Sequence, residues 1–471
     1  MLSISRFLIT RDKVDTPRRH LMLKQFASLA VAVSKNSSIL NSSVRAVSTM
    51  SEKFKLPEKY KGSEYTVWAE FIDLALQYKP LNLGQGFPDF AAPAHVTKNL
   101  AAVAGSDEPL LQQYTRGYGH LRLVNALSKI YSPLIGREID PKTEMITTAG
   151  AYEALYSAIL GHVGPGDEVI LVEPYFDCYE PMVTAAGGNC VFVPLRPTKT
   201  SGTILSSDWK LDEKELEAAF NKKTKIFLLN TPHNPIGKVF TQAELEMIAK
   251  LCKKWNVLVL SDEVYEWMVY EPYKHIRIAT LPDMWERTIT IGSAGKTFSV
   301  TGWKTGWAYG PANMIHNLQV VHQNNLNSIN TPTQEAIARS LEEEIARRNS
   351  SDCYLVSLAK ELKVKRDYMA KFFTEIGMVP TIPEGGYFMM VDWTPLASKV
   401  GLAEESDKYK DYKYAKWMTK NNKLQGIPPS AFYSPAHKNL GENYIRYCFI
   451  KKEETLKKAE QILKTWAGSK K

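Results

Sequence analysis

One lysine in this sequence is placed where its amine could do covalent chemistry. Lys296 follows a run of apolar or small residues, Ile289 to Gly292, that predicts a buried strand, and Gly295 lets backbone or ligand approach closely. A lysine removed from water loses its proton more readily and can then attack a carbonyl carbon to form a Schiff base. A surface lysine on a loop is the alternative, and the neighbouring motifs argue against it.

Two further polar residues follow predicted strands. V-L-V-L-S-D-E-V-Y (residues 257–265) places Asp262 after four apolar residues, where a carboxylate needs a partner such as a bound cationic group. I-F-L-L-N-T-P-H-N-P-I-G-K (residues 226–238) ends in a proline-fixed turn that holds Asn234 as a neutral donor. The alternatives are a helix cap or turn for the aspartate and a purely structural N-P-x-G turn.

A fourth motif could bind phosphate. T-T-A-G-A-Y-E-A-L (residues 147–155) has a glycine at a predicted helix start, where free N–H groups and the positive end of the helix dipole favour an anion. Alone, such a glycine is usually only a cap. Together, a reactive lysine, a carboxylate for a ring nitrogen, a donor for a ring hydroxyl and a phosphate cradle are the needs of pyridoxal phosphate.

The elements that carry these motifs alternate between strand and helix from about residue 144. The expected strands are 168–172, 189–193, 226–229, 257–260 and 288–291, and the expected helices include 151–162 and 242–255. Such alternation predicts a parallel sheet covered on both faces, with ligands bound beyond the carboxyl ends of its strands.

The pattern changes after about residue 333, and the length of 471 residues predicts two or three domains. We expect a smaller α+β domain with helices at 334–348, 355–376 and 453–466 and strands at 386–393 and 444–449. The charged stretch 404–413 lacks apolar periodicity and is interpreted as an exposed loop. Residues 51–80 are expected to form an arm across the body.

Composition excludes several function classes. The net charge of +9 is concentrated in residues 1–50, which hold eight basic and two acidic side chains, against 51 basic and 48 acidic ones elsewhere. Without a basic stripe in the body, nucleic-acid binding is not expected. Five scattered cysteines predict free thiols in a reducing compartment and no zinc site. No apolar run approaches the roughly 20 residues that span a membrane.

The first fifty residues differ from the rest. They are rich in arginine and serine and poor in acids, which is typical of a mitochondrial transit peptide. A disordered cytosolic tail and a secretory signal around residues 26–33 are the alternatives, and the cysteine pattern opposes the secretory one. We therefore expect a mitochondrial matrix protein, with a possible cytosolic form that starts at Met50.

Five stretches resemble the class I and II aminotransferases of PLP fold type I, and most closely the kynurenine aminotransferases, also called glutamine transaminase K or cysteine-S-conjugate β-lyase. They are N-L-G-Q-G-F-P-D-F (82–90), E-P-Y-F-D-C-Y-E-P-M (173–182), S-D-E-V-Y-E-W-M-V-Y (261–270), G-S-A-G-K-T-F (292–298) with T-G-W-K (301–304), and Y-I-R-Y-C-F (444–449). The similarity extends from about Trp68 to the C-terminus.

The resemblance implies an α/β fold, in which a mixed, mostly parallel sheet lies between helices in a large domain beside a smaller α+β domain. The implied division is a leader at 1–50, an arm at 51–69, a small domain at 70–95 and 345–471, and a large PLP-binding domain at 96–344.

The resemblance also assigns roles to single residues. Lys296 would hold pyridoxal 5'-phosphate, Asp262 would face its ring nitrogen, and Arg446 would grip the substrate carboxylate. The other assigned positions are Asn234 and Tyr265 at the ring hydroxyl, Phe176 on the ring face, Ala151, Tyr152, Ser293 and Lys304 at the phosphate, Tyr114 reaching the phosphate of a neighbouring subunit in a homodimer, and Gly86 and Trp68 with Asn234 at the substrate. The alternatives are a surface ion pair for Arg446 and a plain apolar anchor for Trp68.

The implied activity is ping-pong transamination from kynurenine, glutamine or aromatic and sulfur amino acids to a 2-oxo acid, with kynurenic acid formed from kynurenine. A β-lyase side activity on cysteine S-conjugates is also implied. The stretch N-N-L-N-S-I-N-T-P-T-Q (324–334) departs from the family pattern, lacks its aromatic residue, and is expected near the pocket. An aspartate-, alanine- or aromatic-type aminotransferase and a non-catalytic PLP-fold protein are the alternatives.

Overall fold

The computed structural model of the chain describes residues 54–468, and its largest element is a seven-stranded sheet. In spatial order the strands are β2 (Met145–Thr148), β11 (Gly306–Tyr309), β10 (Thr288–Ser293), β9 (Leu258–Asp262), β8 (Thr224–Asn230), β3 (Glu168–Glu173) and β4 (Asn189–Pro194). Only β11 runs antiparallel to its neighbours in this sheet. The mixed, mostly parallel sheet is thus confirmed. The ends of the five expected strands differ by one or two residues from the ends of the observed strands.

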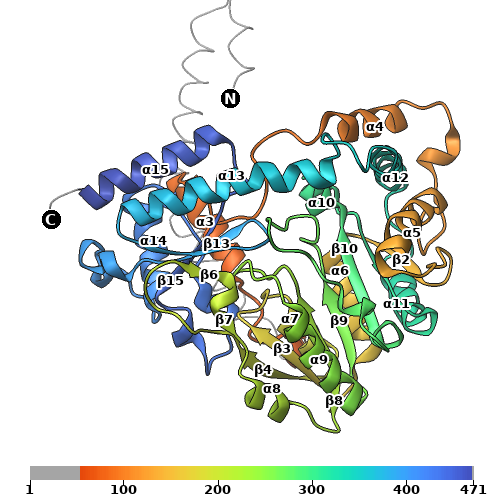
Figure 1. Cartoon of the computed structure of the whole chain (residues 1–471), viewed down its shortest axis with the longest axis horizontal. Helices are drawn as coiled ribbons and strands as arrows, with labels where there is room; N and C mark the ends of the chain where they lie inside the picture. The colour runs from red at the N-terminus through yellow and green to blue at the C-terminus, as the bar shows by residue number, and fades with distance from the viewer. Residues whose placement is uncertain (1–53, 469–471) are drawn as a thin grey trace, which may run out of the picture. The chain divides into compact units, whose positions relative to one another are not determined.

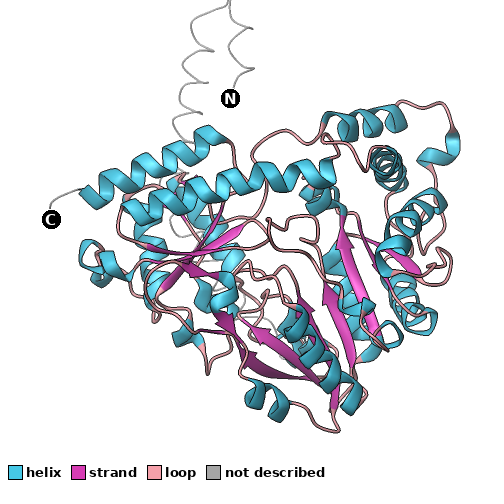
Figure 2. Ribbon diagram, viewed as in Figure 1, coloured by secondary structure: helices cyan, strands magenta, loops and turns pink. Residues whose placement is uncertain are grey.

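Helices cover both faces of this sheet because alternate strand residues are apolar on both sides. Leu228 and Leu260 belong to a core shared with one set of helices, whereas Phe227 and Val259 belong to a second core on the other face. Figure 2 shows helices flanking the strands. The first set comprises α6 (Ala151–His162), α7 (Tyr179–Ala185) and α11 (Ala312–Asn325), and the second comprises α8 (Glu213–Ala219) and α9 (Gln242–Trp255).

A third core covers the β2–β11 edge of the sheet. Met145, Trp307 and Tyr309 pack there with Leu127 and Ile337. The helices that supply this core are α4 (Ala94–Ala104), α5 (Leu121–Ile135) and α12 (Thr331–Ala346). This edge therefore carries a buried helical layer of its own.

A four-stranded sheet forms the second part of the fold. Its order is β15 (Tyr444–Cys448), β13 (Phe388–Asp392), β12 (Val379–Ile382) and β6 (Ile204–Leu205). The nearby helices are α3 (Val67–Tyr78), α13 (Tyr354–Glu375), α14 (Lys410–Asn421) and α15 (Glu453–Gly468), and α13 and α15 lie side by side in Figure 1. Short two-stranded sheets join β1 (Leu81–Asn82) to β14 (Leu424–Gln425) and β5 (Arg196–Pro197) to β7 (Trp209–Lys210).

The strand β6 comes from the middle of the sequence assigned to the large domain, yet it pairs in parallel with β12. Helix α3 crosses the expected boundary between residues 69 and 70. The exact division into domains stays a prediction. The pairing of β6 with β12 shows that a segment assigned to the large domain supplies a strand of the small sheet.

The interpretation of residues 404–413 as an exposed loop was wrong at both ends. Glu405 and Asp411 are buried, and α14 begins at Lys410. Asp411 is satisfied by the main-chain N–H and hydroxyl of Ser430, at 2.7 and 2.9 Å, and Glu405 accepts hydrogen bonds from Lys420. Charged residues were therefore buried by partners distant in sequence, which periodicity cannot reveal.

From Gly62 onward the described chain forms one compact unit, while residues 54–61 belong to a separate unit that includes a 3-10 turn at Glu58–Tyr60. The expected leader at 1–50 lies outside the described residues. All five cysteines are free thiols. Between residues 54 and 468, no helix has the length and apolar character needed to cross a membrane.

Candidate active site

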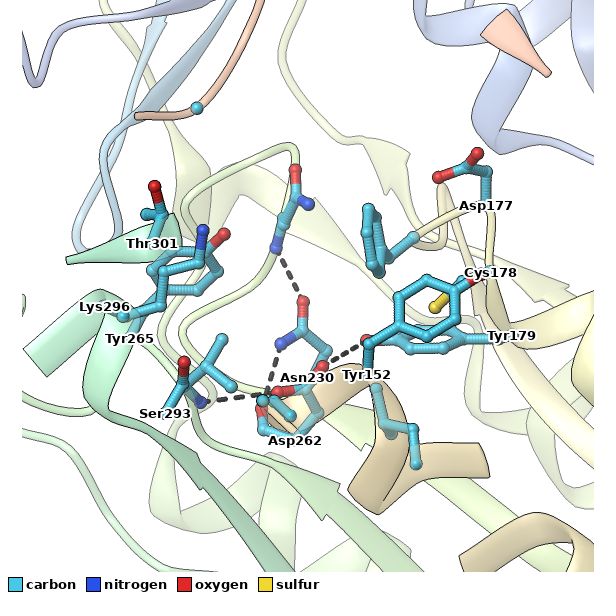
Figure 3. Close-up of a pocket in the computed structure, with 18 of the residues that line it drawn as sticks. Tyr152, Asp177, Cys178, Tyr179, Asn230, Asp262, Tyr265, Ser293, Lys296 and Thr301 are labelled. Carbon is cyan, nitrogen blue, oxygen red and sulfur yellow. Dashed lines mark hydrogen bonds between the residues drawn. The ribbon is translucent and has the colours of Figure 1, made fainter. Parts of the chain in front are cut away.

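A cavity of about 510 Å³ lies where the ends of β8, β9 and β10 meet residues of the small sheet. Every site residue predicted from the sequence lines it except Tyr114: Trp68, Gly86, Ala151, Tyr152, Phe176, Asn234, Asp262, Tyr265, Ser293, Lys296, Lys304 and Arg446. Figure 3 shows Lys296 and Tyr265 on one side of this cavity, with Tyr152, Cys178 and Tyr179 on the other. The individual roles stay predictions, and the geometry below defines what each side chain can do.

Lys296 lies in α10 (Ala294–Thr297), the short turn of helix that directly follows β10. Its amine donates a hydrogen bond of 2.6 Å to the Tyr387 hydroxyl and lies 5.8 Å from the centroid of the Tyr265 ring. Burial lowers the pKa of Lys296 to about 8, because the ammonium form loses hydration. A substantial fraction of the amine is therefore neutral near pH 7.5, which is the form that attacks a carbonyl carbon.

Asp262 is the last residue of β9 and is only 4% exposed. Its Oδ2 accepts a 2.6 Å hydrogen bond from the Tyr179 hydroxyl, and its Oδ1 accepts a longer one from the main-chain N–H of Val264. Both donors are neutral, and burial raises the pKa of Asp262 to about 6. A cationic ligand nitrogen would supply the charge that this carboxylate lacks.

Asn234 is held by hydrogen bonds on two sides. Its main-chain N–H donates to Oδ1 of Asn230 at 2.7 Å, and its own Oδ1 accepts from Arg446 at 3.0 Å. This assignment leaves the NH₂ group of Asn234 as the donor available to a ligand. The peptide bonds before Pro232 and Pro235 are cis, and they shape the turn that carries this asparagine.

The amino end of α6 forms a cradle for an anion. Gly150 caps this helix with φ of 78°, which favours glycine, and a Cβ there would lie 3.4 Å from Nζ of Lys304. The N–H groups of Ala151 and Tyr152 begin the helix, where no earlier turn accepts their hydrogen bonds. With Ser293 nearby in the cavity lining, this end combines a lysine, a hydroxyl and a helix dipole that favour phosphate.

Arg446 is a buried cation, and none of the carboxylates in residues 54–468 is in hydrogen-bonding contact with it. It lies in β15, is 1% exposed, and its Nη atoms donate to Asn234 Oδ1 and to the main-chain carbonyl of Gly84. Its guanidinium stacks 3.9 Å from the centroid of the Phe388 ring. Burial lowers the pKa of Arg446 to about 10, so the side chain stays charged at neutral pH. A ligand carboxylate would meet a planar, oriented fork.

The cavity lining also contains a carboxylate that the sequence analysis did not assign. Trp68 donates a 2.9 Å hydrogen bond from its indole to Asp177, the residue after Phe176. Asp177 lines the cavity, and burial raises its pKa. The Trp68 ring also lies 5.2 Å from the Arg446 guanidinium carbon, so it is a pocket residue as well as an apolar anchor.

Tyr114 and the 324–334 stretch do not line the cavity of this chain. Tyr114 is 89% exposed, in the loop that follows a 3-10 turn at Pro109–Gln112. The end of α11 and the start of α12 pack beside the same loop, because Thr331 donates to the main-chain carbonyl of Gln113. Within one subunit, the departure at 324–334 therefore does not shape the pocket as we had expected.

The contacts that three residues make with site residues were missed from the sequence. Tyr179 and Asp177 lie within the quoted stretch 173–182, but nothing in the pattern showed that they would contact Asp262 and Trp68. Tyr387 follows two glycines just before β13, and this G-G-Y-F sequence was a signal that could have been used. Within residues 54–468, no group of three or more His, Cys, Asp or Glu side chains could hold a metal ion.

Many known proteins are similar in sequence to this chain. The sequence matches the family described as aminotransferase class I and II over residues 78–462. It is 48% identical to kynurenine–oxoglutarate transaminase 3 of Homo sapiens over 98% of this chain and 100% of that protein. The corresponding values for kynurenine–oxoglutarate transaminase 1 of Homo sapiens are 44%, 86% and 96%.

Solved structures are similar over most of the chain. N-succinyldiaminopimelate aminotransferase of Mycobacterium tuberculosis matches with a TM-score of 0.78 and 33% identity, covering 88% of this chain and 100% of that one. A single mutant of the aspartate aminotransferase of Thermus thermophilus matches with a TM-score of 0.74 and 25% identity, covering 88% and 99%. The fold class expected from the sequence is thereby confirmed.

Proposed function

This chain belongs to the class I and II aminotransferases, and from that premise we propose that it uses pyridoxal 5'-phosphate to move the amino group of kynurenine to a 2-oxo acid. One observation carries the proposal. A single cavity combines a lysine amine of lowered pKa, a buried carboxylate with neutral donors, and a buried arginine that has no carboxylate partner in the described part of the chain. The names of the relatives support kynurenine as donor and 2-oxoglutarate as acceptor.

The residues present fit pyridoxal 5'-phosphate at each of its functional groups. Lys296 would bond to its aldehyde carbon, Asp262 would face its ring nitrogen, and the α6 cradle with Lys304 and Ser293 would take its phosphate. The remaining contacts would come from Asn234 and Tyr265 at the ring hydroxyl and from Phe176 on the ring face. When bound, the cofactor supplies an electron-withdrawing ring that stabilises negative charge developing at the substrate Cα.

The protein's own side chains would supply orientation and proton transfer. Arg446 would hold the α-carboxylate through its planar fork, which directs the Cα–H bond toward Lys296. With a pKa of about 8, the amine of Lys296 can take the Cα proton as a base and later return it as an acid. Asp262 would keep the ring nitrogen protonated throughout.

We extend the proposal to glutamine and to aromatic and sulfur amino acids, whose side chains would lie between Trp68 and Phe176. Removal of the Cα proton also permits loss of a good leaving group from Cβ. A carbon–sulfur β-lyase side activity on cysteine S-conjugates is therefore part of the proposal. Ring closure of the oxo acid formed from kynurenine would give kynurenic acid.

We propose a homodimer on the basis of Tyr114. This side chain is exposed on the surface of one subunit and does not line the cavity of its own chain, as expected for a group that reaches the cofactor phosphate of a neighbour. Leu110, in the preceding 3-10 turn, is also strongly exposed. Light scattering on the purified chain would give its mass in solution.

We also propose that the protein acts in the mitochondrial matrix, because residues 1–50 have the composition of a transit peptide. Translation from Met50 would give a cytosolic form. Sequencing the mature amino terminus from fractionated cells tests both ideas, since a full leader on the mitochondrial protein would contradict cleavage.

The decisive experiment is a substrate panel with the full chain loaded with pyridoxal 5'-phosphate. Kynurenine is offered with 2-oxoglutarate and other 2-oxo acids, and kynurenic acid is followed by its absorbance. Glutamine, phenylalanine, aspartate and alanine serve as competing donors. We expect kynurenic acid to form, and a preference for aspartate or alanine with no reaction of kynurenine would contradict the proposal.

A further inference from the structure

Tyr387 joins the reactive lysine to the loop at the substrate entrance. Its hydroxyl accepts the hydrogen bond from Lys296 at 2.6 Å and donates one to the main-chain carbonyl of Gly86 at 2.8 Å. A carbonyl oxygen can only accept, and a phenol has a single proton. The proton of Tyr387 must therefore point to Gly86, so the phenol oxygen presents its lone pairs to Lys296.

The loop at residues 84–87, here called the mouth loop, is held by three buried side chains from the C-terminal part of the sequence. Arg446 donates to the carbonyl of Gly84, and Tyr387 donates to that of Gly86. Lys451 donates to the carbonyl of Phe87 at 2.8 Å and to that of Gln85 at 3.4 Å. Each main-chain carbonyl of the mouth loop thus has a donor. Tyr387 is the donor that also contacts Lys296.

The position of Tyr387 is fixed by its surroundings. It is 1% exposed, its ring lies 5.1 Å from that of Tyr265 at a nearly perpendicular angle, and its carbonyl accepts from the N–H of Phe449. A Cβ on Gly86 would come within 2.4 Å of the Phe388 ring and 3.0 Å of the Tyr387 ring. The Tyr387 ring is therefore packed closely against the mouth loop.

We propose that Tyr387 is a positioning residue, whose hydroxyl holds the Lys296 amine whenever that amine is not bonded to the cofactor and ties this position to the mouth loop. The inference rests on the proposed function, because it concerns the lysine that the cofactor would occupy. Tyr387 does not exchange protons in this role. Burial raises its pKa well above the ordinary range, and its hydroxyl donates to the main-chain carbonyl of Gly86.

From the hydrogen bond between Lys296 and Tyr387 we predict how the pKa of Lys296 changes when the Tyr387 hydroxyl is removed. An ammonium donates a stronger, charge-assisted bond to a phenol oxygen than a neutral amine does, so the Tyr387 hydroxyl favours the protonated form. Its removal should lower the pKa of Lys296 by about one unit. The charged and titratable groups that also face this amine are Cys448, Arg446, Asp262, Lys304 and Tyr265, and all of them are the same in wild type and variant.

The test compares wild type with Tyr387→Phe by reloading the cofactor-free full chain with pyridoxal 5'-phosphate across a range of pH. The growth of visible absorbance gives the rate, and borohydride reduction followed by peptide mass analysis shows that Lys296 carries the adduct. For Tyr387→Phe we expect the midpoint of the plot of loading rate against pH to lie about one pH unit lower than in wild type, because the amine loses its proton at a lower pH. We also expect a plateau about tenfold lower, because the amine is no longer held in place.

Tyr270→Phe is the matched control. The Tyr270 hydroxyl donates to the main-chain carbonyl of Gly386, the residue before Tyr387, so this variant also leaves a buried carbonyl without its donor. We expect its midpoint to equal that of wild type. The inference is wrong if Tyr387→Phe keeps the wild-type midpoint or if Tyr270→Phe shifts it equally, whereas failure of the wild type to load at Lys296 would refute the proposed function instead.

Discussion

Asp262 and Glu263 are neighbours in sequence and equally deep in the protein, but their surroundings differ. Asp262 faces the cavity, has only neutral donors, and has a raised pKa. Glu263 faces away, where it accepts from Ser261 at 2.8 Å and His275 at 2.7 Å and lies 3.7 Å from Arg277. Burial alone would raise the pKa of Glu263, but the charges of His275 and Arg277 lower it overall.

The comparison of Asp262 with Glu263 distinguishes two kinds of buried charge. One kind lines the cavity and can pair with a ligand, and the other is paired within the protein and stabilises the fold. Glu263 belongs to a buried network in which Arg277 also pairs with Glu266, and Glu266 accepts a 2.5 Å hydrogen bond from Tyr131. The cavity instead contains Asp262, Lys296 and Arg446, and among the residues that the structure describes none of the three has an ionic hydrogen-bond partner. We therefore expect changes on the cavity side to alter chemistry, and changes on the network side to alter stability.

The largest effect should follow Lys296→Ala. Loss of the amine removes both the covalent attachment and the base, so turnover should fall at least about 10³-fold in a transamination assay. When both proteins are measured without cofactor, the midpoint of thermal unfolding of the variant should be at or above that of wild type, because a poorly hydrated amine is removed. Lys238→Ala is the contrasting control. Lys238 is buried but pairs with Glu244 at 2.8 Å, so its loss should lower the unfolding midpoint.

Arg277→Ala should be the most damaging change on the network side. It leaves Glu263 and Glu266 buried without their arginine, and breaking a buried pair in this way costs about 3–5 kcal/mol in free energy of unfolding. Urea denaturation of loaded enzyme measures this loss. Lys464→Ala removes exposed ion pairs with Glu460 and Glu375 and should leave the free energy of unfolding nearly unchanged. Equal losses in free energy of unfolding for Arg277→Ala and Lys464→Ala would contradict the idea that the buried network stabilises the fold more than an exposed ion pair does.

Asp262→Asn should lower turnover about 10²-fold, because a neutral amide cannot stabilise a cationic ring nitrogen.

In the cofactor-free protein, Asp262→Asn should also remove a pH dependence of the free energy of unfolding. The folded pKa of about 6 lies above the ordinary value of 3.8, so wild type binds the proton more tightly when folded and loses stability as pH rises between these values. The loss is on the order of 3 kcal/mol. Urea denaturation of cofactor-free wild type at pH 4.5 and 7 should show it, and an equal slope in the variant would exclude Asp262 as its source.

A smaller effect is expected for Arg446→Lys, which keeps the charge but loses the planar fork. Because lysine cannot donate two parallel hydrogen bonds, kcat/KM for amino acids should fall about 10- to 100-fold, with KM rising more than kcat falls. Arg366→Lys is the matched control. Arg366 is also buried, donates to the carbonyl of Pro383 and stacks on Tyr270, but it does not line the cavity. Its substitution should leave kcat/KM within about twofold.

Local signals explain which parts of the fold were predictable. Helix α9 was predicted to the residue, since Thr241 and Glu244 form a capping box at its start and Asn256 ends it in the left-handed region. Helix α14 was not predicted, and its first residues were assigned to a loop. Its first four residues are polar or aromatic, and the burial of Asp411 depends on Ser430, which is distant in sequence.

The site shows the same limit. Lys296, Asp262 and Asn234 could be located because each follows an apolar strand, and parallel strands bring their carboxyl ends to one edge. Tyr387 could not be assigned a function in this way. Its hydroxyl contacts Lys296, 91 positions away, and Gly86, 301 positions away, and only the folded chain brings these together.

The short strand β6 has a practical consequence for anyone who wishes to divide this protein. Residues 204–205 supply the outermost strand of the small sheet, where Ile204 is opposite Thr381 and Leu205 opposite Ile382. A fragment beginning at residue 345 would carry β12 with one side of its backbone unpaired, which invites aggregation between copies. Expressed by itself, such a fragment should be insoluble, and co-production with a complementary piece that includes residues 204–205 should rescue it.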